Sequence, residues 1–342
     1  MLKSGNDAEF FGEKLEKILK EVIEESMLDP QFAVFQEGGR NQYLLRKLSQ
    51  NGKRILWALG KQLVAGDLRP KAIEQDLYFE EDGLSLRGRI DRVDSFLTED
   101  QKTLFLKVLD YKSGKKDFSL KRLFAGLDLQ LPLYMDYVLR EEEKKHKDME
   151  ILPSAMFYFT MDNPALPYDP EKDAEKERLK ALKPKGLVNI SEESLSHLEK
   201  LDAGESLCLP VQVKDGAVEE KGAAVSKEKF DALLSYAKKK MREEHRRIKA
   251  GEKDIFPMEE GNEQTACSYC PYHSICGFDE NIPNFRYRRL EDKTEEEFWT
   301  EILKDAEAKM KEEGKTKAKA EQDSEAKQET EAKKKATRKG DE

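Results

Sequence analysis

Two aspartates and a lysine in the first half of the chain have the spacing of a hydrolytic metal site. Asp91 lies in the segment GRIDRVD (88–94), and Asp110 and Lys112 lie in VLDYKSG (108–114). In an extended strand, residues two apart point to the same face, so Asp110 and Lys112 would project together. Paired carboxylates bind a hard divalent cation, which lowers the pKa of a bound water. A nearby ammonium can orient that water or stabilise developing negative charge. The pattern therefore predicts metal-assisted hydrolysis.

A simpler interpretation of Asp110 and Lys112 is an ordinary ion pair at the end of a strand, and the two residues alone favour it. The context favours the metal site instead. The segment GRID lies in one strand, VLDYKSG ends the next, and Gln130-Leu-Pro-Leu-Tyr134 follows on a helix. Gln130 and Tyr134 by themselves would indicate only one exposed helix face.

The elements that must position these residues follow from the apolar pattern. Amphipathic helices are expected over about 8–27 and 41–65 and are interpreted as scaffold. Three strands in an antiparallel meander come next, followed by a helix, a buried strand and a later helix. This order predicts an α/β fold with a mixed central sheet flanked by helices. The expected ranges are 72–79, 84–96 and 103–111 for the three strands, 119–141 for the helix, 155–160 for the buried strand and 226–249 for the later helix.

Composition sets further limits on the protein. The 342 residues carry a net charge of −9, which does not favour DNA binding by bulk electrostatics but allows a local basic groove. The sequence has neither an apolar run long enough to cross a membrane nor a signal peptide, so we expect a cytoplasmic protein. From about residue 309 the chain is almost entirely Lys, Glu, Ala and Thr, which predicts a disordered tail over 309–342.

The three motifs G-x-x-D, D-Y-K and Q-x-x-x-Y resemble those of the RecB-type branch of the PD-(D/E)XK nuclease superfamily. The resemblance implies a restriction-endonuclease-like core acting on DNA. It implies that Asp91 and Asp110 bind Mg²⁺ and that Lys112 is the catalytic lysine. In the family, the residues matched by Gln130 and Tyr134 help to position the scissile strand and the lysine. Glu74 matches a further metal-binding carboxylate on the first strand.

Arg89 shares the strand face of Asp91 by alternation. It could contact a phosphate, and a place on an ordinary surface strand is about equally compatible with the sequence.

Three of the four cysteines lie within ten residues, as Cys267-x2-Cys270-x5-Cys276. Thiolates this close suit a soft metal or an iron–sulfur cluster. The spacing resembles the C-terminal cysteines of iron–sulfur nucleases in the RecB-type group, which implies a structural 4Fe-4S cluster. Zinc, with His273 as a fourth ligand, is the lower-ranked alternative. Cys208 is expected to be a small buried side chain.

Within this group, the sequence is most similar to the nuclease region of AddB, which is one of the two subunits of the ATP-dependent helicase/nucleases. The family carries a first cluster cysteine and an active-site histidine on the N-terminal side of the core, whereas residues 1–72 contain neither Cys nor His. We therefore expect a piece of a longer protein, with an incomplete cluster ligand set.

The expected organisation is a helical part over 1–70, a nuclease domain with the cysteine segment over 71–290, a short helix over 291–308 and the tail. The expected function is break processing for recombinational repair, in a heterodimer with an ATP-hydrolysing helicase/nuclease subunit. The alternatives are an inactive DNA-binding or assembly fragment and a CRISPR-associated nuclease.

Overall fold

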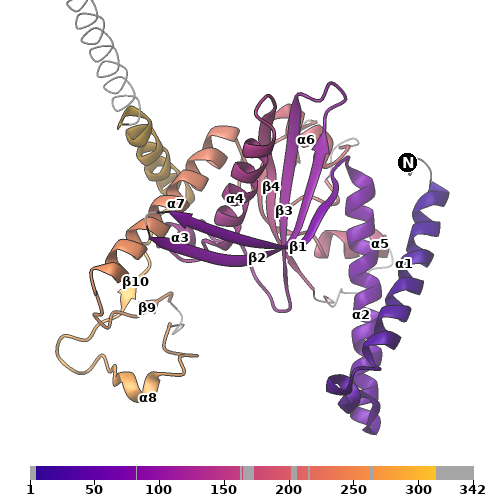
Figure 1. Ribbon diagram of the computed structural model, residues 1–342, viewed down its shortest axis with the longest axis horizontal. Helices are drawn as coiled ribbons and strands as arrows, with labels where there is room; N and C mark the ends of the chain where they lie inside the picture. Colours follow the sequence, from indigo (N-terminus) through magenta and orange to yellow (C-terminus); the bar gives the residue numbers. More distant parts are fainter. Residues whose placement is uncertain are drawn as a thin grey trace, which may run out of the picture.

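A computed structural model of the chain describes residues 5–81, 83–161, 164, 173–201, 206–214, 216–261 and 265–312. Its central element is a mixed sheet of six described strands in the order β1-β2-β3-β4-β5-β8 (Figure 1). The predicted antiparallel meander is confirmed in β1–β3, and β4 then pairs parallel to β3. The strands are β1 Arg69–Glu81, β2 Leu84–Leu97, β3 Thr103–Lys112, β4 Glu150–Thr160, β5 Lys185–Asn189 and β8 Ala224–Val225.

Strands β3 and β4 are central because their sequences are apolar on both faces. Every residue of β3 from Leu104 to Asp110 is buried, and so is every residue of β4 from Ile151 to Phe159. A strand buried on both sides shows a continuous apolar run, without the alternation of a half-exposed strand. Because the two strands are parallel, the chain crosses over the sheet between them, and this crossover carries the segment after Lys112.

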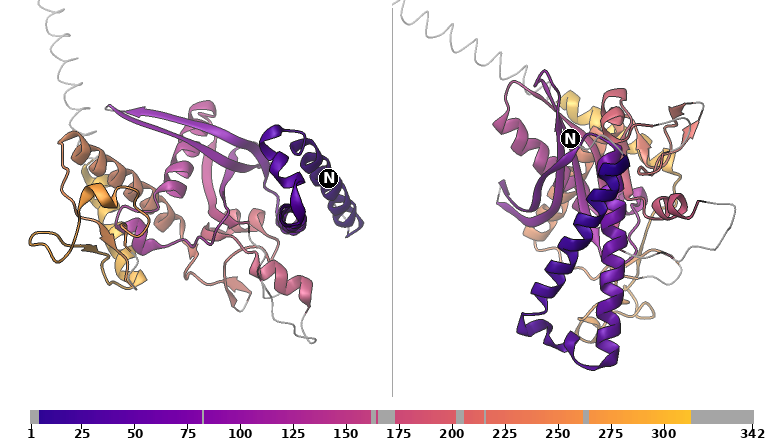
Figure 2. Two further views of the ribbon diagram at one scale, coloured as in Figure 1. Left: turned by 90° about the horizontal axis from the view of Figure 1, so that it is seen from below. Right: turned by 90° about the vertical axis from the view of Figure 1, so that its right-hand side faces the viewer.

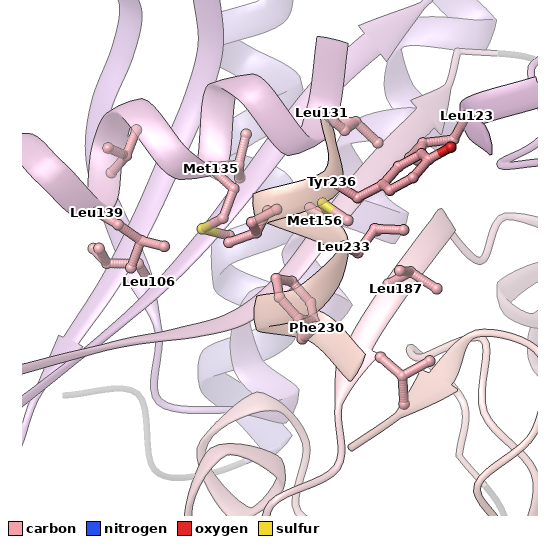
Figure 3. Packing of buried hydrophobic residues seen from close by; sticks show 14 of the residues in the cluster. Leu106, Leu123, Leu131, Met135, Leu139, Met156, Leu187, Phe230, Leu233 and Tyr236 are labelled. Atoms are coloured by element: carbon pink, nitrogen blue, oxygen red, sulfur yellow. The ribbon is translucent and has the colours of Figure 1, made fainter. Parts of the chain in front are cut away.

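Helices α4 (Gln130–Lys145) and α7 (Lys227–Lys249) cover one face of the sheet (Figure 1). Met135 and Leu139 of α4 meet Phe230 and Leu233 of α7 in the main core, around Met156 of β4 (Figure 3). Full burial of each such side chain stabilises the fold by roughly 1.5–3 kcal/mol. A helix that includes residues 295–312 completes this layer.

The opposite face is covered by α5 (Ala174–Ala181), α6 (Glu192–Leu198) and the C-terminal part of α2 (Gly38–Ala65). Leu198 of α6 packs with Leu109 and Phe157, while Ala58 of α2 packs with Phe159. The rest of α2 forms a hairpin with α1 (Gly5–Ser26) through the 3-10 helix η1 (Pro30–Gln36), and this hairpin stands beside the sheet (Figure 2). The two N-terminal helices predicted from the sequence are confirmed.

The single helix predicted over 119–141 is wrong. The segment forms a short helix α3 (Leu120–Phe124) and then α4 from Gln130. Between them, Gly126 and Asp128 have φ angles of +84° and +53°, which no helix accommodates. The break allows the chain to turn back so that α4 begins over the end of β3.

The remaining described elements are short. They are the two-stranded pairs β6 (Val213–Lys214) with β7 (Ala217–Val218) and β9 (Met258–Glu259) with β10 (Arg288–Arg289), and the helix α8 (His273–Cys276). The cysteine segment around α8 lies beyond the end of α7, away from the N-terminal hairpin (Figure 1). Of the described helices, none has the length and apolar character needed to cross a membrane. Most of the predicted tail, from residue 313 onward, lies outside the described residues.

Candidate active site

Strands β2 and β3 separate at the point where Asp91 lies. Their ladder runs from Leu97–Leu104 to Arg92–Leu109, and beyond it β2 continues in its pairing with β1. Asp91 Oδ2 accepts a hydrogen bond from the backbone N–H of Tyr111 at 2.6 Å, which takes the place of the next rung. The fork thereby fixes the Asp91 carboxylate at the end of β3, where its charge acts on Asp110.

Asp110, Lys112 and Gln130 form one connected group at this fork. Lys112 Nζ lies 2.6 Å from Asp110 Oδ2 and donates to Gln130 Oε1 at 2.9 Å. Gln130 Nε2 in turn donates to Asp110 Oδ1 at 2.7 Å. The Gln130 amide therefore binds the carboxylate through its nitrogen and the ammonium through its oxygen, which holds both groups in a defined relation. The structure brings these three predicted residues together.

Tyr134 adds a further contact to this group and accounts for the glycine, Gly88, in the first motif. Its hydroxyl oxygen accepts from Gln130 Nε2 at 3.1 Å, one helical turn along α4. A Cβ placed on Gly88 would lie 3.3 Å from both Cε1 and the hydroxyl oxygen of Tyr134, closer than ordinary van der Waals contact. Gly88 and Tyr134 belong to motifs that are far apart in the sequence, and the fold brings the two residues into contact.

The buried carboxylate of Asp110 has the properties of a cation ligand. Burial raises its pKa, Lys112 opposes that rise, and the nearby charge of Asp91 adds to it. Within the described residues, Asp110 Oδ2 is buried and makes no hydrogen bond of good geometry, so its close contact with Lys112 is an ion pair. A buried carboxylate oxygen without a hydrogen bond costs free energy. A divalent cation bound by Asp91 and Asp110 would give this oxygen a partner.

Glu74 lies outside this buried group. Its side chain is 68% exposed and forms an ion pair with Arg89 at 3.3 Å, and its own φ of +49° falls in the left-handed region. Arg89 also donates to Asp76 at 3.0 Å, so in this structure it is engaged by carboxylates on β1. Across the described residues, no group of three His, Cys, Asp or Glu side chains is arranged to hold a metal ion. A role for Glu74 as a metal ligand stays a prediction.

The sequence interpretation missed a second charged group beside the site. Asp128, just before α4, accepts hydrogen bonds from Lys116 Nζ and Arg122 Nε, both at 2.6 Å. Arg122 also pairs with Glu260. Burial alone would raise the pKa of Asp128, but the hydrogen bonds from Arg122 and Lys116 lower it. Asp128 fixes the entry into α4 and hence the place of Gln130. Asp128 has a left-handed backbone conformation, which Asp tolerates better than most residues. The sequence alone does not reveal this conformation, so the group was missed.

Cys267, Cys270 and Cys276 lie on one partly buried turn-rich segment. Cys270 N–H donates to the Cys267 carbonyl at 3.2 Å, and Cys276 N–H donates to the Tyr272 carbonyl at 2.8 Å. The described residues show no metal-holding arrangement of these thiols. Cys208 is buried as predicted, and burial raises the pKa of its thiol to about 12.

This fold and this group of side chains define a nuclease of the PD-(D/E)XK kind, and sequence comparison agrees. A family model described as the PD-(D/E)XK nuclease superfamily matches residues 6–277, and the chain belongs to that superfamily.

Three relatives are each named as the B subunit of an ATP-dependent helicase/deoxyribonuclease. The chain is 31% identical to the protein of Alkaliphilus metalliredigens over 87% of its own length and 27% of the relative. It is 31% identical to that of Clostridium botulinum over 89% and 27%, and 28% identical to that of a Thermoanaerobacter species over 86% and 26%. The chain thus spans about a quarter of the length of these relatives.

Proposed function

We propose that this chain is the nuclease module of a helicase–nuclease that processes DNA double-strand breaks for recombinational repair. The observation that carries the proposal is the contact of Asp110 with Lys112 and Gln130 at a strand fork that also holds Asp91. The names of the relatives support DNA as the substrate class and a heterodimer with an ATP-hydrolysing helicase/nuclease subunit. The proposed catalytic residues are Asp91, Asp110, Lys112, Gln130 and Tyr134.

Asp91 and Asp110 would hold the cation, with Mg²⁺ as the proposed ion, and Glu74 as a candidate third ligand. Mg²⁺ is commonly bound by only one or two carboxylates together with water and substrate phosphate, so two aspartates suffice. When bound, such an ion supplies an activated water and offsets charge on the phosphoryl group.

Lys112 and Gln130 provide the protein's own part of the chemistry. The Lys112 ammonium has three N–H donors, one of which is directed to Gln130 Oε1. Another can donate to a phosphoryl oxygen or to the attacking water as negative charge develops there. The Tyr158 ring lies near this ammonium, with Lys112 Nζ 5.3 Å from the ring centroid, and this contact limits how far the lysine can swing.

The chain should degrade single-stranded DNA in the presence of Mg²⁺ and lose this activity in EDTA. The physical reason is that neither aspartate alone activates water, whereas a bound cation does. A gel assay on an end-labelled oligonucleotide measures the rate, and readdition of Mg²⁺ should restore it. DNA binding without cleavage in any divalent cation would instead support the alternative of an inactive nuclease fold.

We propose the division of the chain into a helical part (1–70), a nuclease domain with the cysteine segment (71–290), a short helix (291–308) and a charged tail (309–342). The described helix that includes residues 295–312 overlaps the last boundary.

For the cysteine segment we propose a 4Fe-4S cluster held by Cys267, Cys270 and Cys276, with a zinc site that adds His273 as the alternative. The spacing of the three cysteines supports this proposal, as does their partial burial on one short segment. The full chain, purified without oxygen, should contain iron and sulfide and show broad visible absorption.

The variant Cys270→Ser should lose this iron, whereas Cys208→Ser should keep it because Cys208 lies buried with Phe159 and Leu179 in a separate cluster. Metal analysis of both variants distinguishes the cases. Stoichiometric zinc in place of iron, lost in Cys270→Ser, supports the alternative. A metal content that is the same in Cys270→Ser and Cys208→Ser contradicts both sites.

A further inference from the structure

A cavity of about 460 Å³ lies between the start of β5, the segment before α3 and the helix that includes residues 295–312. Three lysines and several aromatic side chains line it, which is the combination that proteins use to hold single-stranded nucleic acid. The lining residues that matter here are Lys121, Lys185, Lys293, Phe118 and Trp299.

The pairing of the strands places this cavity next to the proposed active site. Asp110 pairs with Tyr158 across β3 and β4, and Tyr158 pairs with Lys185 across β4 and β5. Residues directly opposite one another in neighbouring strands point to the same face, so all three side chains project together. Neighbouring strands are about 4.8 Å apart, which puts the Cα atom of Lys185 roughly 10 Å from that of Asp110.

The position of Leu187 supports this geometry. Leu187 is two residues after Lys185 and therefore shares its face, and it packs with Leu233 and Phe230 in the core that lies under α7 (Figure 3). The Lys185 side chain is therefore on the same side of the sheet as the Asp110 group, at the exposed end of β5. Gly186 keeps β5 tight against β4, since a Cβ there would lie 1.9 Å from the Met156 carbonyl oxygen.

Lys185 is the lysine of this cavity that is available for a ligand. It is exposed, and the described part of the chain offers it no acidic partner. Among the described residues, the ion pair of Lys121 is a 3.6 Å contact with Asp292, whose side chain is fully exposed. Such a surface pair is readily exchanged for another anion. Lys293 is committed to Glu291 and Glu301.

Two carboxylates, Asp117 and Glu295, also line the cavity. They reduce the positive charge of the cavity, so we do not expect it to bind polyanions non-specifically. Binding here instead needs a phosphate placed at Lys185, within reach of Lys121. A strand already held at the active site supplies such a phosphate at high effective concentration.

We propose that this cavity binds a backbone phosphate of the DNA strand next to the bond held at Asp110, with Lys185 as the principal contact. This inference rests on the nuclease function proposed above. The paired residues Asp110, Tyr158 and Lys185 form a row across the sheet. The DNA strand would follow this row, away from the fork and toward helix 295–312. With Lys185 as a contact, the chain recognises a second backbone phosphate in addition to the phosphodiester that is cut.

The test uses the full chain carrying Asp110→Ala, which should bind single-stranded DNA without cutting it. Adding Lys185→Ala should weaken binding of a labelled oligonucleotide about 3- to 10-fold at low salt, and Lys185→Glu should weaken it further. The slope of log K against log salt should fall in magnitude by about 0.7, the value for one phosphate contact on a single strand. Lys185→Arg should bind like the parent chain.

The matched control is Lys47, which is exposed on α2 and likewise has no ion pair among the described residues. Lys47→Ala and Lys47→Glu should leave both affinity and salt slope unchanged. If the Lys185 variants match the Lys47 variants while the parent chain binds and the unmodified chain cuts, the cavity inference is overturned and the nuclease function stands. If the parent chain binds no DNA and the unmodified chain cuts none, both fail together.

Discussion

The variant Asp110→Asn should lose DNA cleavage by about three orders of magnitude or more while keeping its fold. Its amide has nearly the shape of the carboxylate but cannot supply the negative charge that a divalent cation needs. Asp110 lies where Lys112 and Gln130 converge and beside Asp91, so its replacement removes the proposed metal site at its centre. Initial rates on single-stranded DNA in Mg²⁺ measure the effect.

The same variant should be more stable than the unmodified chain at neutral pH in EDTA. Burial raises the pKa of Asp110 above its ordinary value near 3.9, so the ionised carboxylate is disfavoured in the folded state. Its contribution to stability is greatest at low pH and is lost as the pH rises through the raised folded pKa. Asparagine removes this penalty, and the thermal midpoint should therefore rise.

Mg²⁺ should raise the thermal midpoint of the unmodified chain and leave that of Asp110→Asn unchanged, because the proposed metal site is intact only in the unmodified chain. The control is Asp76→Asn, which alters an exposed carboxylate paired with Arg89 and should keep both cleavage and the response to Mg²⁺. Normal cleavage by Asp110→Asn would show that the hydrolytic centre lies elsewhere.

The sequence predicted the strands, and the closeness of Asp110 and Lys112, because both depend on local signals. Apolar runs identify β3 and β4, and the two-residue spacing of Asp110 and Lys112 places them on one face. The contact of Tyr134 with Gly88 was not predictable, since it needs α4 to lie over the fork. The same is true of Asp128, whose partners Lys116 and Arg122 are brought together by a turn that the helical pattern conceals.

Arg92 and Asp94 show a different limit of sequence reasoning. The segment GRIDRVD has charged residues on both faces of a strand, Arg89 and Asp91 on one and Arg92 and Asp94 on the other. This alternation gives no sign of which charges are buried. In the structure, Asp94 is fully buried and Arg92 nearly so, because α5, α6 and α2 cover this face of the sheet. Burial of charge is decided by elements distant in sequence, and it carries an electrostatic cost that only a matched partner offsets.

That partner is supplied by a network of three charges beneath the candidate active site. Arg92 binds Asp94 through two hydrogen bonds, Nε to Oδ1 at 2.6 Å and Nη2 to Oδ2 at 2.7 Å. Lys107 Nζ of β3 lies 2.9 Å from Asp94 Oδ2. Arg92 Nη1 also donates to the hydroxyl of Tyr111 at 3.2 Å, and the Tyr111 backbone holds Asp91. The network therefore ties β2 to β3 just where they separate.

The variant Asp94→Ala should destabilise the fold by about 3–5 kcal/mol, since it leaves two buried cations without their anion. Chemical denaturation at neutral pH measures the loss, and Asp76→Ala, at an exposed pair, should change stability little. Burial alone would raise the pKa of Asp94, but Lys107 and Arg92 lower it. Its stabilising contribution is therefore present above about pH 3.9 and is lost as the pH falls through the lower folded pKa.

A variant that also replaces the two cations separates the cost of unpaired charge from the loss of packing. The triple change Arg92→Met, Asp94→Leu and Lys107→Met removes every charge of the network and keeps most of its volume. It should recover most of the stability lost in Asp94→Ala, because apolar side chains of similar size often match a buried ion network. Equal instability of the single and triple variants would mean that the network stabilises through its hydrogen-bond geometry, and a stable Asp94→Ala chain would contradict the burial on which the argument depends.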